Sequence, residues 1–124
     1  MKKALRIAFL GTVIFTFAEA APLEAWRPLK ARYTIFSGPI LADREAPTLT
    51  DRKLTVLVEG LAAKEIFDSI GPDDPPVCRQ EKGDRERAKE GVQCTYTAHG
   101  VTKGYQCWIG IDLRTGKSIS TVSC

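Results

Sequence analysis

Four cysteines in a short chain constrain this sequence more than any other feature. All of them lie in the C-terminal half of the 124 residues, at positions 78, 94, 107 and 124. An even number of cysteines in a small chain indicates a framework of two disulfides. The gaps between them are too long for the closely spaced ligands of a zinc site, and the only histidine is His99. We therefore expect no metal ion and no cofactor, and cysteines held in disulfides do not act as nucleophiles.

The C-terminal tail suggests one way to pair the cysteines. Residues 105–113 and 118–124 have strand-like compositions, and Thr115-Gly116 between them suits a two-residue turn. In that hairpin Cys107 faces Cys124. This register favours the pairs Cys107–Cys124 and Cys78–Cys94, each closing a loop of about 16 residues that stabilises the fold by roughly 3 kcal/mol.

A second hairpin leaves another pairing open. If the chain turns at Gly100-Val101, Cys94 stands opposite Cys107, and Cys78 is left for Cys124. A glycine bulge at Gly116 would also shift the first register by one residue. We favour Cys78–Cys94 with Cys107–Cys124 and keep the second pairing as its alternative.

The N-terminus has the three-part pattern of a secretory signal peptide. A cationic start with Lys2, Lys3 and Arg6 precedes an apolar run over residues 7–18, which is shorter than the roughly 20 residues needed to span a bilayer. Ala18-Glu19-Ala20 then has the small-x-small pattern of a cleavage site. We expect cleavage near Ala20 and export of the mature protein to the periplasm.

Loss of residues 1–20 changes the charge of the chain. Three cationic side chains and one anionic side chain leave with this segment, so the formal net charge falls from +3 to about +1. A near-neutral chain lacks the electrostatic footprint of a nucleic-acid-binding protein. No later apolar run reaches spanning length, and the first cysteine, Cys78, is far from the apolar run. We therefore expect neither a nucleic-acid partner nor a membrane anchor.

Residues 21–124 are predicted to form a single α+β domain. The expected strands are 32–36, 53–59, 92–98, 104–113 and 118–122, and the expected helix is 61–70. The last three strands should form an antiparallel meander. The helix should dock on the sheet, because a helix of about ten residues is not stable alone. The charged stretch 79–90 is expected to be a solvated loop or an exposed helical turn.

Three places in the sequence are candidates for contact with a partner. Trp108 lies on the polar face of its strand, so it is either covered by another segment, such as the N-terminal arm, or exposed for a partner. The second candidate is the segment Ser37-Gly38-Pro39-Ile40-Leu41. Its Ser37-Gly38-Pro39 part is either a short rigid turn that presents a hydroxyl to an active-site groove or a turn with no further role. The third candidate is the hairpin tip over residues 99–104, which contains His99 and Gly100, because stiff loops lose little entropy on docking.

Motifs that carry enzymatic chemistry do not occur in the sequence: there is no phosphate-binding loop, serine-hydrolase elbow, zinc-peptidase helix or calcium loop. His99 lies in a glycine-flanked tip, which is a poor support for a catalytic triad. The acidic pairs Asp73-Asp74 and Asp43 with Glu45 have no apolar surroundings that would make one carboxyl a general acid for glycoside hydrolysis. We therefore expect a binding protein and not an enzyme.

Several elements occur together between residues 54 and 124: a strand ending in glycine, a short amphipathic helix, two cysteine-containing strands and a tight turn. They read Leu54 to Gly60, Leu61 to Ile70, Cys94-Thr95-Tyr96, Tyr105-Gln106-Cys107-Trp108 and Asp112 to Lys117. In this layout the chain resembles small periplasmic proteins of Gram-negative bacteria, among them immunity proteins that protect a cell from type VI secreted peptidoglycan amidases. The resemblance implies an inhibitor, compatible with a homodimer, that blocks the amidase by inserting loops into its active-site groove.

The expected partner is therefore a secreted cell-wall amidase. The candidate contact residues are Ser37, Gly38, Pro39, His99, Gly100 and Trp108. The alternative function is an envelope structural or ligand-binding protein without enzymatic activity.

Overall fold

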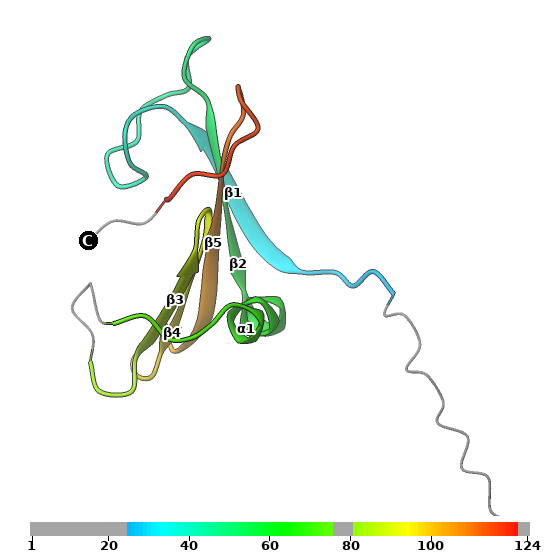
Figure 1. The fold of residues 1–124 in the computed structure, drawn as a ribbon, viewed down its shortest axis with the longest axis vertical. Helices are drawn as coiled ribbons and strands as arrows, with labels where there is room; N and C mark the ends of the chain where they lie inside the picture. Colours follow the sequence, from blue (N-terminus) through cyan, green and yellow to red (C-terminus); the bar gives the residue numbers. More distant parts are fainter. Residues whose placement is uncertain (1–24, 76–80, 122–124) are drawn as a thin grey trace, which may run out of the picture.

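The computed structural model describes residues 25–75 and 81–121, which form a five-stranded antiparallel sheet and one α-helix. The elements are β1 (Lys30–Phe36), β2 (Lys53–Glu59), α1 (Gly60–Ser69), β3 (Arg85–Lys89), β4 (Val92–Thr97) and β5 (Gly104–Asp112). The strand order is β1-β2-β5-β4-β3 (Figure 1). The predicted α+β class is confirmed. The predicted signal peptide lies outside the described residues.

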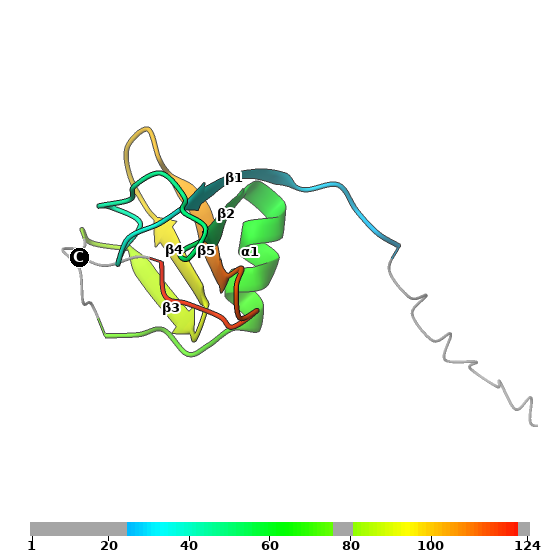
Figure 2. The same ribbon diagram turned by 90° about the horizontal axis from the view of Figure 1, so that it is seen from above.

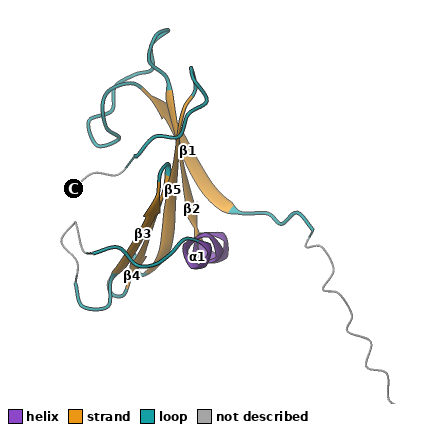
Figure 3. Cartoon of the chain, viewed as in Figure 1, coloured by secondary structure: helices purple, strands orange, loops and turns teal. Residues whose placement is uncertain are grey.

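Helix α1 lies against one face of the sheet, near the end where β2 finishes and β5 begins (Figures 1 and 2). The connection between β1 and β2 and the turn after β5 lie at the opposite end of the sheet (Figure 3). Ala63 and Phe67 are four residues apart, so they share one side of the helix, and both are fully buried. They pack with Val58 of β2, Cys94 of β4 and Cys107 of β5. This cluster is the hydrophobic core.

The core contains a disulfide between Cys94 and Cys107. The two residues are directly opposite each other on β4 and β5, with their Cα atoms 4.0 Å apart. The favoured pairs Cys78–Cys94 and Cys107–Cys124 are therefore wrong, since each would need a cysteine that is already paired. The hairpin about Gly100-Val101 gave the right register for this bond. Cys78 and Cys124 themselves lie outside the described residues.

The favoured pairing failed because the tail does not form the expected strand. Of the described residues after β5, only Ser118 bridges to the sheet, opposite Ile111. The Asp112 amide donates to the Lys117 carbonyl at 2.8 Å. Strand β5 therefore reaches the turn at Asp112, whereas a two-residue Thr115-Gly116 loop would be closed by residues 114 and 117. The tail then crosses Gly110, where an added Cβ would lie 2.2 Å from a Thr121 methyl carbon. Glycine at 110 therefore lets the tail cross the sheet instead of pairing along it.

The meander is present, but it is built from β3, β4 and β5. Strand β3 comes from the stretch 79–90, which was expected to be a loop or a helical turn, so that expectation is wrong for Arg85–Lys89. The strand forms because its cationic side chains find partners on the helix side of the sheet. The guanidinium carbons of Arg85 and Arg87 lie 5.0 and 4.3 Å from the centroid of the Phe67 ring.

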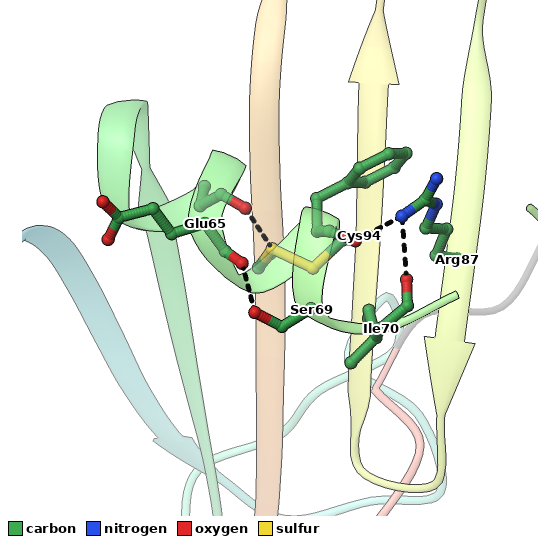
Figure 4. Close-up of a disulfide and its surroundings, with 8 residues drawn as sticks. Glu65, Ser69, Ile70, Arg87 and Cys94 are labelled. Atoms are coloured by element: carbon green, nitrogen blue, oxygen red, sulfur yellow. Dashed lines mark hydrogen bonds between the residues drawn. A yellow bond between two sulfur atoms is a disulfide. The ribbon is translucent and has the colours of Figure 1, made fainter. Parts of the chain in front are cut away.

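Arg87 also ties β3 to the end of α1. Its Nη1 donates to the carbonyl oxygens of Phe67 at 2.8 Å and Ile70 at 3.1 Å, which are among the carbonyls that the last helical turn leaves unpaired (Figure 4). Asp73, just beyond the helix, accepts from Nε of Arg85 at 2.7 Å and from Nε of Arg87 at 2.6 Å. This network fixes the return of the chain from α1 to the sheet edge.

Asp73→Asn is expected to lower the free energy of unfolding at neutral pH and to have little effect at pH 2. Hydrogen bonds from Arg85, and then from Arg87, lower the pKa of Asp73 from 3.8 to about 2. A carboxyl whose pKa is lower in the folded state stabilises the fold above its unfolded pKa, and this contribution is lost as the pH falls through the folded pKa. The window therefore runs from about pH 4 down to pH 2. Urea unfolding of both proteins at pH 7, 4 and 2 measures it.

The control for this experiment is Asp74→Asn, which removes the same charge from the neighbouring position. Its stability difference from the wild type should be smaller than that of Asp73→Asn at pH 7. A difference for Asp73→Asn that persists undiminished at pH 2 would contradict the proposed role of the carboxylate.

Candidate functional site

The sheet face opposite α1 carries the candidate site. Cys107 Sγ lies 3.3 Å from the Ala63 carbonyl oxygen, so Cys107 points to the helix and its neighbour Trp108 points to the other face. Strand register places Leu57 of β2 opposite Trp108, and Arg32 of β1 opposite Leu57. These three residues form a row across three strands.

A groove of about 340 Å³ lies along this row. Its walls come from β1, β2 and β5 and from the connection between β1 and β2. The lining residues are Arg32, Tyr33, Thr34, Leu41, Arg44, Thr55, Leu57 and Trp108. Thr55 is only 3% exposed, and its hydroxyl has no hydrogen-bond partner among the described residues. The lining thus offers apolar contact and two guanidinium groups.

The connection between β1 and β2 is held in place by its own hydrogen bonds. Ser37 and Glu45 exchange two backbone hydrogen bonds of 3.0 Å. The Ser37 hydroxyl donates to the Ala46 carbonyl at 2.8 Å, and Ser37 is 2% exposed. Gly38 has φ of 102° and donates its amide to Asp51 Oδ2 at 2.8 Å. The Ser37 hydroxyl is therefore engaged inside the loop, and of the three predicted residues Pro39 is the exposed one.

Asp51 anchors the end of this connection. Its carboxylate accepts hydrogen bonds from the Lys53 ammonium and from the Gly38 amide, and these bonds, in that order of size, lower its pKa. A carboxylate that remains ionised keeps both partners in place. Leu41 and Arg44 are therefore presented over the sheet by a braced loop.

The hairpin tip between β4 and β5 holds the other two predicted residues. His99 and Gly100 are exposed, and the His99 Nε2 atom lies 3.2 Å from the Lys82 carbonyl oxygen. Asp84 braces the tip because its Oδ1 accepts from the Ala98 amide at 2.8 Å, a bond that is the main cause of its lowered pKa. Neither His99 nor Gly100 lines the groove beside Trp108.

A second hollow connects the tip to the row. It has a volume of about 420 Å³, and Arg32 lines both hollows. The tip contributes Val101, Thr102 and Lys103 to it. The structure therefore brings the predicted tip next to the groove through residues 101–103, whereas His99 and Gly100 line neither hollow.

The described part of the N-terminal arm lies along α1 and does not cover Trp108. Arg27 forms a two-pronged ion pair with Glu65, with N–O distances of 3.0 and 2.8 Å. Trp26 is fully exposed. Trp108 is instead flanked by the connection that carries Leu41 and Arg44.

Sequence reasoning singled out Trp108 and the turn that ends at Leu41, but it missed Arg32, Arg44 and Leu57. A signal for Leu57 was present, because alternation in strand 53–59 places it opposite the core residues Leu54, Val56 and Val58. Its position beside Trp108 depends on the pairing of β2 with β5, whose starts at Lys53 and Gly104 are far apart in the sequence. No local pattern indicates that pairing. Arg44 has no periodic signal at all.

Two further observations concern residues 25–75 and 81–121. This part of the chain contains no cluster of histidine, cysteine or acidic side chains that could hold a metal ion. Its helix is too short and too polar to cross a membrane.

In comparisons with known proteins, no family model, no curated protein and no solved structure matches this chain.

Proposed function

We propose that this protein is a periplasmic immunity or inhibitor protein that binds and blocks a secreted peptidoglycan amidase. The observation that supports this most is the groove beside Trp108 on the helix-free face of the sheet. Tryptophan and arginine are the residue types that most often dominate binding energy at protein interfaces, and both line this groove. The class of partner comes from the resemblance to amidase immunity proteins.

Two features of the fold suit such a role. The Cys94–Cys107 disulfide is compatible with an oxidising compartment outside the cytoplasm. The connection between β1 and β2 and the hairpin tip are both braced by aspartate side chains, Asp51 and Asp84. Loops that are rigid before docking lose less entropy on binding, which favours tight inhibition.

The proposal is tested with the purified mature chain and an amidase encoded beside its gene. We expect a stoichiometric complex and loss of amidase activity towards purified sacculi. Cells that export the protein should survive the amidase in their periplasm, whereas cells that express it without residues 1–20 should not. A chain that neither binds nor inhibits the amidase contradicts the proposal. Cosedimentation with sacculi in the absence of any protein partner would then favour the envelope-binding alternative.

A further inference from the structure

Positive charge is concentrated around the groove beside Trp108. Arg32 and Arg44 line the groove, and among residues 25–75 and 81–121 no carboxylate lines it. The adjoining hollow shares Arg32 and adds Lys30 and Lys103, against the single carboxylate of Glu59. The groove and the adjoining hollow together form a cationic strip with Lys30, Arg32, Arg44 and Lys103. This strip contrasts with residues 21–124 as a whole, whose positive and negative side chains nearly balance.

The cationic groups of the strip are available for a partner. The side chains of Lys30 and Arg32 are 78% and 71% exposed, and each lies 3.9 Å from the Glu59 carboxylate, beyond hydrogen-bond distance. Arg44 is exposed, and its Nη1 donates a long hydrogen bond of 3.4 Å to the Leu41 carbonyl. Guanidinium groups placed in this way form strong, two-pronged bonds with carboxylates.

Apolar side chains lie between these cations. Trp108 and Leu57 are partly buried neighbours on adjacent strands, and Leu41, from the connection between β1 and β2, lines the same groove. A partner that supplied only charge would leave this apolar surface in contact with water. A partner with an apolar side chain next to a carboxylate matches both parts of the strip.

We propose that the groove binds an acidic segment of a partner protein, with an apolar side chain against Trp108 and Leu57 and a carboxylate between Arg32 and Arg44. The inference rests on the proposed function in that it names the chemistry which the partner presents. A second copy of the chain is a poor occupant, because a two-fold contact through this strip would bring like charges together. An acidic segment removes that repulsion.

A peptide titration followed by NMR tests this without any amidase. The ¹⁵N-labelled mature chain is titrated with the blocked peptide Gly-Leu-Glu-Phe-Glu-Leu-Gly and with its twin in which both Glu are replaced by Gln. The chain has two tryptophans, so Trp26, which is fully exposed beside α1, supplies an internal control signal. We expect the acidic peptide to shift the indole signal of Trp108 and to leave that of Trp26 in place. The Gln twin should bind about tenfold more weakly.

Variants locate the binding. Arg32→Ala combined with Arg44→Ala should weaken the acidic peptide about tenfold, because two exposed ion pairs are removed. Arg27→Ala removes a cation on the α1 side and should leave the affinity unchanged. Higher salt should weaken the wild type more than the double variant. Circular dichroism and the dispersion of the NMR spectrum establish that each variant is folded.

Three outcomes would overturn the inference: equal affinity for the two peptides, equal affinity of the double variant and the wild type, or no shift of the Trp108 signal at millimolar peptide. A shift with phosphatidylglycerol vesicles and none with the peptide would also overturn it, and would assign the strip to an anionic membrane surface. Peptide binding without amidase binding would leave this inference in place and remove the proposed function. Amidase binding that is unchanged in the double variant would retain the proposed function and overturn this inference.

Discussion

Replacing Phe67 with alanine is expected to lower the free energy of unfolding by about 4 kcal/mol, which is the largest effect of any single substitution in this fold. Phe67 is fully buried in the last turn of α1 and makes a T-shaped contact with the Tyr105 ring, with the ring centroids 5.2 Å apart. Its other neighbours are the guanidinium groups of Arg85 and Arg87. Truncation therefore leaves a cavity beside two cations and also removes the ring on which they stack.

Urea unfolding of residues 21–124 measures this loss. The matched control is Leu61→Ala on the same helix, since Leu61 is 66% exposed and its truncation should cost less than about 1 kcal/mol. If Phe67→Ala and Leu61→Ala cost the same, Phe67 does not occupy the core that the structure assigns to it. If Phe67→Ala fails to fold, the free energy of unfolding lost in the smaller change Phe67→Leu is compared with that lost in Leu61→Ala.

Loss of the Cys94–Cys107 disulfide has the second largest expected effect. The double variant with alanine at both positions should be less stable by about 3 kcal/mol, because the bond closes a short loop and restricts the unfolded chain. The two residues are separated by 13 positions in the sequence, and both are fully buried against α1. Their truncation therefore also removes packing atoms from the core.

Two measurements check this prediction. Mass mapping of nonreduced peptides should recover Cys94 linked to Cys107, whereas recovery of Cys78 linked to Cys94 would contradict the structure. Urea unfolding of the double variant should then show the loss of stability, and a decrease below about 1 kcal/mol would mean that the bond does little for the fold. The same peptide map tests whether Cys78 is linked to Cys124, as the alternative pairing predicts.

Local patterns in the sequence predicted most of the elements near the core. Strand 53–59 was predicted with the bounds that β2 has, and helix 61–70 differs from α1 by one residue at each end. Both segments bury an apolar stripe, so their periodicity reflects the force that forms them. Trp108 was placed on the face opposite Cys107 for the same reason.

Strand β3 could not be predicted in this way, because it has no apolar stripe. Its helix-side residues Arg85 and Arg87 are stabilised by Phe67, by Asp73 and by the carbonyl groups at the end of α1. These partners come from 12 to 20 residues earlier in the chain. A pattern of charges that is stabilised by distant partners looks the same in the sequence as a solvated loop.

The disulfide and the site depended on register, which single strands do not specify. Two hairpin registers competed for Cys107, and the outcome depended on the tail crossing Gly110, where no side chain obstructs it. In the same way, Arg32, Leu57 and Trp108 become neighbours only when β1, β2 and β5 pair. Sequence analysis could single out Trp108, but it could not find the residues of β1 and β2 that line the groove beside it.

Titration calorimetry of two tryptophan variants against the amidase proposed as the partner tests the central claim, that the face around Trp108 is the binding surface. Trp108→Ala and Trp26→Ala remove the same side chain from opposite sides of the sheet, and urea unfolding confirms that both are folded. Trp108→Ala should weaken the complex by about 30-fold or more, the size expected of an interface anchor. Trp26→Ala should leave the affinity within about twofold of the wild type. Equal affinities for the two variants, or a greater loss for Trp26→Ala, would contradict the account.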